Sequence, residues 1–492
     1  MQQAKQVALK RGKQERGVAA LVAVFGLALG AGCSGEGSTG MTTAQPNLPF
    51  TSGMPGDMSA GAPSGSTPGD SPTPGGNGTS ESMGQPTTLL PGTGMSGDTG
   101  GTGTVAPANM PPNTPPGAQH WVGTWTASPY FDMGNQPPAS LANAVLRQIA
   151  HVSLGGSQLR LQFSNLSGNG PVTIRSSHIA LSSSSAVADS AIDPATDKAL
   201  AFSGSETVTI AQGQEVWSDP IDFALAAASN ITITTAFGNV PLNVVGHSGS
   251  RTTSYLQAGS SDVSAASMAS ATPTDHWYYI SGIDVMADAS AVGVVAIGDS
   301  ITDGRGTDTN KNNRWTDILA ARLLANEATA HVAMMNQGIG ATNLVGNAGT
   351  AAQARFAHDV LNPSGVRYAI VFDGVNDIGG GAQFAGMKAA YDDLIARAHA
   401  KGLLIYGATI LPFGGNGYYT AAHEAVRQQV NDYIKSGVFD GFIDFEAAVT
   451  DGGNPPKLQA TYAAWSQQDG LHPGPAGYVA IGNAADLSLF TR

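Results

Sequence analysis

The chain has 492 residues, of which 23 are Lys or Arg and 36 are Asp or Glu, giving a formal net charge of -13 at pH 7. This length exceeds that of one ordinary domain, so we expect two folded units together with non-globular sequence. Only 12% of the residues are charged and 64 are Gly, which indicates that part of the chain is not packed. A chain with this net negative charge is not expected to form a basic surface for phosphate backbones, so we do not expect nucleic acid as a partner.

The N-terminal residues have the layout of a signal peptide. Basic side chains gather within residues 1–16, and residues 18–32 are an uninterrupted run of apolar and small residues. This run is too short for a comfortable transmembrane helix. It ends at Cys33, the single cysteine of the chain, which rules out an intramolecular disulfide. We therefore predict that residues 1–32 are a removable export signal.

The segment Leu29-Gly30-Ala31-Gly32-Cys33 resembles the bacterial lipobox, in which a peptidase cuts before the cysteine and the thiol is acylated. Gly30 departs from the pattern, since a larger aliphatic residue is commoner there. The resemblance implies a lipoprotein whose Cys33 is lipidated and anchored to the cell envelope, at the outer membrane or the cell surface. Each buried methylene of an acyl chain contributes about 0.8 kcal/mol to such attachment. The alternative is a plain secretory signal with an incidental cysteine.

Residues 33–117 read as a linker. They consist mainly of Gly, Ser, Thr, Pro and Met, with Phe50 as the one aromatic residue and no Lys or Arg. Such a composition cannot bury enough surface to offset chain entropy. We predict a disordered, flexible tether that holds the folded part away from the membrane.

Residues 118–287 have the pattern of short strands. Apolar and polar side chains alternate at 159–163 and 231–234, and Gly and Ser clusters such as 155–157 mark turns. This pattern predicts an all-β sandwich or jelly roll. Such a domain could bind carbohydrate or only brace its neighbour. Bracing is favoured, because no aromatic residues cluster at strand spacing to form a sugar platform.

Residues 288–492 change to continuous apolar strands that alternate with helices. We predict strands at 292–297, 332–335, 369–372, 403–409 and, more weakly, 442–445, and helices at 315–324 and 384–400. Buried strands separated by helices imply a parallel sheet covered on both faces, which makes a three-layer α/β/α sandwich. Ligands of such folds bind at the carboxyl ends of the strands, so candidate site residues should directly follow strands.

Polar motifs occur at these places. Residues 298–304, 336–340 and 374–377 follow the first three strands, and residues 469–473 lie near the end of the chain. Each motif is weak alone, but acyl transfer requires a hydroxyl nucleophile, a base, a group that orients the base and donors for the oxyanion together. Ser300 supplies the hydroxyl and His472 the base. Asp469, three residues before the histidine on the same turn, can hold the imidazole tautomer, since residues i and i+3 share a face.

Residues 290–492 resemble the SGNH/GDSL hydrolase family, whose four sequence blocks appear here in order. The resemblance implies a flavodoxin-like strand order and hydrolysis of a carboxylic ester through an acyl-enzyme, with Ser300, Asp469 and His472 as the catalytic residues and no cofactor. It also implies that the Ser300 N–H and the Asn376 side chain stabilise the oxyanion.

The second block departs from the family pattern. The glycine that usually donates its backbone N–H is replaced by Ala341, with Gly340 as a neighbouring candidate. A backbone donor needs no particular side chain, so Ala341 can serve if its φ is negative, whereas a positive φ puts the donor geometry in doubt.

Other polar residues near these blocks receive structural interpretations. Asp299 is expected to stabilise the turn before the nucleophile, and Arg314 with Trp315 is expected to pack at the start of a helix. Asp303, Asp308, Asp377 and the histidines other than His472 show no paired spacing that indicates a metal site.

The region before the hydrolase blocks resembles the N-terminal part of hydrolases similar to arylesterases and xylan esterases, through residues 121–125 and 146–148. We therefore expect a secreted or surface-anchored serine esterase that removes short acyl groups, with acetylated polysaccharide as the first choice of substrate. One alternative is a broad-specificity lipase or arylesterase, although no long apolar lid segment is apparent. The other is a carbohydrate-binding surface lipoprotein with a vestigial hydrolase domain. Such a protein would not need all four of Ser300, Asn376, Asp469 and His472, and their presence argues against it.

Overall fold

The computed structural model describes residues 118–131, 134, 136–183 and 189–492. The predicted signal peptide at 1–32, the lipidation site Cys33 and the predicted tether at 33–117 lie outside the described residues. All described residues belong to one compact unit, Gly100–Arg492. Among the described helices, none is long and apolar enough to cross a membrane.

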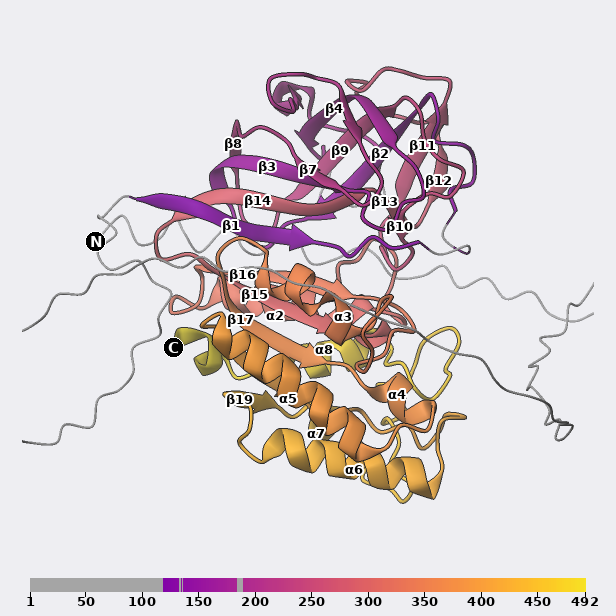
Figure 1. Ribbon diagram of the computed structural model, residues 1–492, viewed down its shortest axis with the longest axis vertical. Helices are drawn as coiled ribbons and strands as arrows, with labels where there is room; N and C mark the ends of the chain where they lie inside the picture. The colour runs from indigo at the N-terminus through magenta and orange to yellow at the C-terminus, as the bar shows by residue number, and fades with distance from the viewer. Residues whose placement is uncertain (1–117, 132–133, 135, 184–188) are drawn as a thin grey trace, which may run out of the picture. The chain divides into compact units, whose positions relative to one another are not determined.

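The N-terminal part of this unit consists of antiparallel sheets (Figure 1). One sheet has the order β1 (Gln119–Thr126), β14 (Ile280–Asp288), β3 (Gly156–Ser164), β7 (Glu215–Trp217), with β8 (Ile221–Leu225) also paired to β3. A second has the order β12 (Thr272–Thr274), β11 (Ser254–Ala258), β2 (Ala144–His151), β9 (Asn230–Phe237), β4 (Val172–Leu181), β5 (Lys198–Ala199), with β6 (Val208–Ile210) on β4. A small sheet pairs β10 (Gly246–His247) with β13 (Trp277–Tyr278).

Both larger sheets contribute to one hydrophobic cluster, because apolar side chains alternate along their strands. Leu161 on β3 and Ile233 on β9 both belong to this cluster and are fully buried. The prediction of a sheet-rich N-terminal region is therefore confirmed, while the finer assignment to a jelly roll stays a prediction.

The C-terminal part contains a five-stranded sheet in which every neighbouring pair is parallel. Its order is β16 (Val332–Gly338), β15 (Val292–Gly298), β17 (Val366–Phe372), β18 (Leu404–Ala408), β19 (Gly441–Ile443). The chain first moves outward from β15 to β16 and then returns to the other side of β15. The carboxyl ends of β15 and β17 therefore flank the switch point at which folds of this kind bind ligands. The predicted parallel sheet is confirmed.

The helices of this part are α1 (Ser300–Asp303), α2 (Trp315–Ala325), α3 (Ala352–Phe356), the π-helix η3 (Ala357–Leu361), α4 (Val375–Gly379), α5 (Phe384–Ala400), α6 (Ala421–Lys435), α7 (Phe445–Val449) and α8 (Pro475–Ala484). The predicted helices at 315–324 and 384–400 agree with α2 and α5. Two short 3-10 helices, η2 (Pro194–Thr196) and η4 (Leu487–Thr491), complete the described elements.

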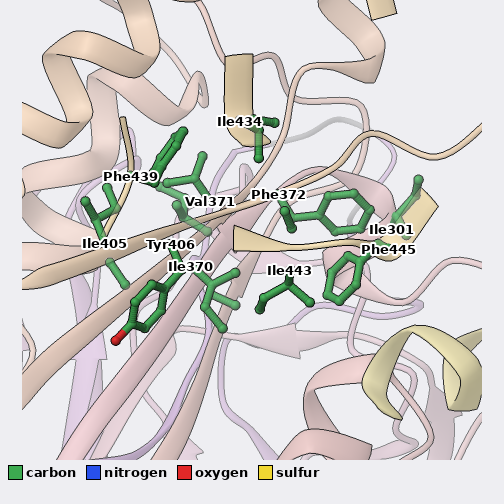
Figure 2. Packing of buried hydrophobic residues seen from close by; sticks show 14 of the residues in the cluster. Ile301, Ile370, Val371, Phe372, Ile405, Tyr406, Ile434, Phe439, Ile443 and Phe445 are labelled. Atoms are coloured by element: carbon green, nitrogen blue, oxygen red, sulfur yellow. The ribbon is translucent and has the colours of Figure 1, made fainter. Parts of the chain in front are cut away.

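The predicted strand at 442–445 is wrong at its end. The β19 strand stops at Ile443, and Asp444 caps α7 by accepting a hydrogen bond from Ala447 N at 3.1 Å. A carboxylate that satisfies a free N–H at a helix start favours helix over continued strand. The following Phe445 turns inward and meets Phe372 edge to face, with ring centroids 4.9 Å apart (Figure 2). This aromatic pair closes the core below the carboxyl ends of the strands.

The first strand of the N-terminal part lies against the edge strand of the parallel sheet. Gly123 allows a close approach there, because a Cβ added to it would lie 2.4 Å from the sulfur of Met335 on β16 and would force that side chain to move. Gly123 N also donates to Ser364 O at 2.9 Å, and Thr126 Oγ1 donates to Asn336 O at 3.2 Å. The Trp-Val-Gly-Thr-Trp sequence at 121–125 thus joins the antiparallel sheet to the hydrolase part.

Candidate active site

Ser300 is the first residue of α1 and directly follows β15. The side chain of Asp299 caps this helix by accepting a hydrogen bond from Ile301 N at 2.8 Å, which confirms its expected role in the turn. Burial and, to a smaller extent, neighbouring carboxylates raise the pKa of Asp299 to about 7. Ser300 is 6% exposed, so the turn presents its hydroxyl at the carboxyl end of the strand while covering most of the residue.

A continuous chain of hydrogen bonds joins the three predicted catalytic side chains. Ser300 Oγ lies 2.7 Å from His472 Nε2, and His472 Nδ1 lies 2.6 Å from Asp469 Oδ2. Since a carboxylate only accepts, Nδ1 carries the proton and Nε2 is left to accept from the serine hydroxyl. The fold thus brings together residues 172 positions apart in the sequence.

The geometric reason we expected for the Asp469–His472 pair is wrong. The two residues do not share a helix face, because they lie in a loop in which Gly470 has a φ of 72°. Asp469 Oδ1 instead accepts hydrogen bonds from Leu471 N at 3.0 Å and His472 N at 2.9 Å. One carboxylate oxygen therefore folds the loop, and the other orients the imidazole.

The electrostatic surroundings keep His472 neutral and Asp469 ionised near pH 7. Burial lowers the pKa of His472 below its ordinary value of 6.5, as do Arg305 and Arg251, and Asp469 only partly opposes this. Burial alone would raise the pKa of Asp469, but its hydrogen bonds from the His472 backbone and imidazole bring that pKa below its usual range. A neutral imidazole beside an anionic carboxylate is the state that can accept a proton from a serine hydroxyl.

Asn376 lies near the start of α4, after β17, where Gly374 adopts a φ of 124°. Its side-chain Nδ2 donates to Thr342 O at 2.7 Å, and its Oδ1 accepts from the Tyr418 hydroxyl at 3.1 Å. Because the Thr342 carbonyl can only accept, the amide must direct its NH₂ group toward it. The residues that the structure describes offer no acceptor for the second N–H of this group, which can therefore serve a ligand in the adjoining pocket.

Sequence reasoning did not identify Tyr418. It lies in the loop before α6, 42 positions from Asn376, and no local pattern marks it. Its contact arises only when the loops after β17 and β18 meet. Nothing in the sequence alone separates this tyrosine from the adjacent Tyr419.

The loop after β16 carries the two candidate backbone donors, Gly340 and Ala341. Ala341 has a φ of 60°, so the negative φ that would favour it as a donor is not present. This left-handed conformation costs a non-glycine residue about 1 to 2 kcal/mol. Asp377 helps to hold the loop, because its carboxylate accepts from Leu344 N at 2.8 Å and Val345 N at 3.0 Å. Asp377 therefore stabilises this loop. The donor role of Ala341 stays a prediction.

Arg314 also has a structural role, as expected. Its guanidinium is buried and donates to Asp303 O at 3.0 Å and to Gly249 O at 3.2 Å. Within the part of the chain that the structure describes, no group of three or more His, Cys, Asp and Glu side chains could hold a metal ion.

A pocket of about 520 Å³ opens at these residues. Its lining includes Ser300, His472, Asn376, Gly340, Ala341, Tyr418 and Leu471, together with Asp303 at the end of α1 and Arg305 after it. The N-terminal part contributes Tyr130, Ser248, Gly249 and Arg251. Sequence reasoning associated no residue of 118–287 with the site. The N-terminal part therefore contributes pocket wall, a role that neither bracing nor separate carbohydrate binding describes.

The model of the GDSL-like Lipase/Acylhydrolase family matches residues 296–480, which include Ser300, Asn376 and the Asp469–His472 pair. Among curated proteins, no relative matches the chain.

Several solved structures resemble part of the chain. A member of the lipolytic protein G-D-S-L family from Veillonella parvula is 19% identical, with a TM-score of 0.30 over 41% of this chain and 100% of that one. A catalytic mutant of an acetylxylan esterase from Geobacillus stearothermophilus is 20% identical, with a TM-score of 0.31 over 40% and 92%. An alpha/beta hydrolase enzyme from the metagenome of Lake Arreo, Spain, is 23% identical, with a TM-score of 0.32 over 41% and 98%.

The family match covers the parallel sheet and its loops, and within it the serine, histidine and aspartate form one hydrogen-bonded chain. Residues 296–480 therefore form a domain of the GDSL-like lipase/acylhydrolase family, and the protein is a carboxylic ester hydrolase.

Proposed function

We propose that this hydrolase uses Ser300 as its nucleophile, with His472 as general base and Asp469 as the residue that orients the base. The observation that carries the proposal is the pair of hydrogen bonds, 2.7 Å from Ser300 Oγ to His472 Nε2 and 2.6 Å from His472 Nδ1 to Asp469 Oδ2. As Oγ attacks the ester carbonyl, Nε2 takes its proton, and the resulting imidazolium is stabilised by the carboxylate. The imidazolium then returns this proton to the leaving alcohol, which leaves an acyl group on Ser300.

Water completes the cycle. His472 removes a proton from a water molecule as its oxygen attacks the acyl carbonyl. When the second tetrahedral intermediate collapses, the C–Oγ bond breaks and the imidazolium returns the proton to Ser300 Oγ, which releases the acid and the free serine. In both intermediates the negative oxygen is stabilised by the Ser300 N–H, by the Asn376 amide and by a backbone N–H of Gly340 or Ala341. In a comparable hydrolase, loss of one such donor lowers kcat by about 10²- to 10³-fold.

The pocket favours short acyl groups on a polar alcohol. Apart from its two tyrosines, Ala341 and Leu471 are its apolar side chains, and the other lining residues are polar, charged or glycine. A long acyl chain would need an extended apolar wall to gain free energy on binding, and this lining does not supply one. We therefore propose acetyl or similar short acyl groups on polysaccharide as the natural substrates.

The direct test compares p-nitrophenyl acetate with p-nitrophenyl octanoate in the purified protein, with Ser300→Ala as the blank. We expect acetate to be turned over faster and both rates to fall to the blank in the variant. Undiminished hydrolysis by Ser300→Ala would refute the mechanism. A clear preference for octanoate would instead refute the short-acyl assignment.

We also propose that the protein is exported and anchored through lipidated Cys33. Support comes from the basic, apolar and lipobox-like pattern of residues 1–33. Incorporation of a radiolabelled fatty acid should occur in the wild-type protein and be lost in Cys33→Ser. Equal labelling of both would contradict the anchor.

A further inference from the structure

Two arginines line the pocket beside Ser300, and they come from separate parts of the chain. Arg305 follows α1, and its backbone N–H donates to Ser300 O at 2.8 Å. Arg251 follows β10 in the N-terminal part. Both make small contributions that lower the pKa of His472, as expected of positive charges near the imidazole. A chain with a net charge of -13 thus places paired cations at its nucleophile.

Arg251 is held in a backbone conformation that its side chain disfavours. Its φ is 49°, in the left-handed region. Asn310 N donates to Arg251 O at 2.8 Å, and the buried Arg314 guanidinium donates to Gly249 O at 3.2 Å. Gly249 lets the segment approach so closely that an added Cβ would lie 1.9 Å from Asp303 Oδ2. Strain that the surroundings impose on a pocket residue commonly accompanies function.

The guanidinium of Arg251 forms a long ion pair with Asp303 but no hydrogen bond within the described part of the chain. Its Nε is buried and has no hydrogen-bond partner among the described residues. Its Nη2 lies 3.9 Å from Asp303 Oδ2, beyond hydrogen-bond distance. The other oxygen of Asp303 lies 2.9 Å from His247 Nε2, so that carboxylate already has a partner. Arg251 therefore keeps donors available to a ligand in the pocket.

Guanidinium donors form a planar fork that matches a carboxylate, and such charge-assisted hydrogen bonds are stronger than neutral ones. The second cation, Arg305, donates from Nη2 to Gln467 Oε1 at 3.0 Å and adds a further positive charge to the pocket lining. Asp303 also lines the pocket, and its negative charge is offset by His247 and Arg314 as well as by Arg251. The pocket lining therefore carries two positive charges that suit an anionic group of a ligand.

We propose that Arg251, assisted by Arg305, forms a subsite for a carboxylate carried by the ester substrate. This inference rests on the proposed function, because it concerns substrates that Ser300 hydrolyses. The carboxylate can belong to the alcohol, as in an O-acetylated uronic acid, or to the acyl group, as in a hemiester of a dicarboxylic acid. In both cases the same guanidinium recognises it, and the ester is presented to Ser300.

The experiment compares matched esters that differ in the carboxylate. For the alcohol side, the pair is O-acetylated methyl galacturonoside and O-acetylated methyl galactoside. For the acyl side, it is monoethyl succinate and ethyl valerate. Initial rates in a pH-stat give kcat/KM for each ester, at a pH on the plateau of each variant's pH profile. The variants are Arg251→Gln, which keeps a side chain at the strained position, and Arg175→Gln, which removes an exposed arginine of β4 as a charge-matched control.

We expect the wild type to prefer the acidic member of at least one pair, and Arg251→Gln to reduce that acidic-to-neutral ratio by about 10- to 100-fold, the loss typical of a hydrogen bond to a charged group. Arg175→Gln should keep the wild-type ratio. The preference should also shrink as NaCl is raised. Which pair shows it identifies the side of the ester that carries the carboxylate.

A binding measurement separates recognition from turnover. Ser300→Ala protein should bind galacturonate or succinate in calorimetry, and the double variant with Arg251→Gln should not. Equal kcat/KM for acidic and neutral esters in the wild type, with acetate turnover intact, would overturn the subsite and leave the proposed function standing. Failure to hydrolyse any of the four esters above the Ser300→Ala blank would overturn both.

Discussion

Replacement of Tyr418 by Phe removes one hydroxyl from the support of Asn376 and keeps the aromatic ring. The ring position is constrained, because a Cβ on Gly379 would lie 2.5 Å from it. The lost hydrogen bond, 3.1 Å from the Tyr418 hydroxyl to Asn376 Oδ1, is a neutral and rather long one. Such a bond contributes about 0.5 to 1 kcal/mol, which corresponds to about a 2- to 5-fold change in rate.

The loss should appear in kcat rather than in KM. Asn376 is proposed to act on the oxyanion, which exists in the transition state and not in the bound ester, so ground-state binding is unaffected. Asn376→Ala sets the upper limit, with an expected loss of about 10²- to 10³-fold. Tyr419→Phe makes the same chemical change at the next residue, which does not line the pocket, and serves as the control.

The assay is steady-state hydrolysis of p-nitrophenyl acetate by the four proteins, with thermal unfolding recorded for each. An increase in KM at constant kcat for Tyr418→Phe would refute the reasoning, since it would place the hydroxyl in ground-state binding. A loss in Tyr418→Phe as large as in Asn376→Ala would also refute it, because one neutral hydrogen bond cannot supply that free energy.

The remaining predictions concern the base and the strained loop. Because burial lowers the pKa of His472 and the base must be neutral, kcat/KM should stay high at pH 7 and fall with acid, with a midpoint below 6.5. In Asp469→Asn this midpoint should move lower still, since the raising effect of the carboxylate is lost; a midpoint above 6.5 in either protein would contradict the pKa direction. Ala341→Gly should raise the free energy of unfolding by about 1 kcal/mol in urea titrations, because glycine adopts a φ of 60° without strain. A decrease in stability would show that the methyl group packs usefully.

Local patterns in the sequence determined the parallel sheet and the positions of its motifs. Apolar runs of strand length indicate strands that are buried on both faces of a sheet. Parallel strands place their carboxyl ends at one edge of that sheet. The motifs that contain Ser300 and Asn376 could therefore be placed at one edge of the sheet from the sequence, whereas the role of Asn376 at the oxyanion was implied by the family resemblance. The Asp469–His472 pair was also predicted, but on the wrong geometric ground of a shared helix face. A carboxylate that accepts hydrogen bonds from the backbone of its own loop produces no periodic sequence pattern, so the loop could not be recognised.

Only the tertiary structure decided how the site is supported and enclosed. Tyr418 reaches Asn376, and Arg251 reaches the pocket beside Ser300, through loops whose paths depend on the packing of whole sheets. Single polar residues in loops carry no periodicity, so the sequence cannot distinguish Tyr418 from Tyr419 or Arg251 from Arg175. The nucleophile is specified by a short motif after a strand and its base by a short motif near the end of the chain. The residues that orient the oxyanion donor and line the pocket are instead specified by contacts between distant segments.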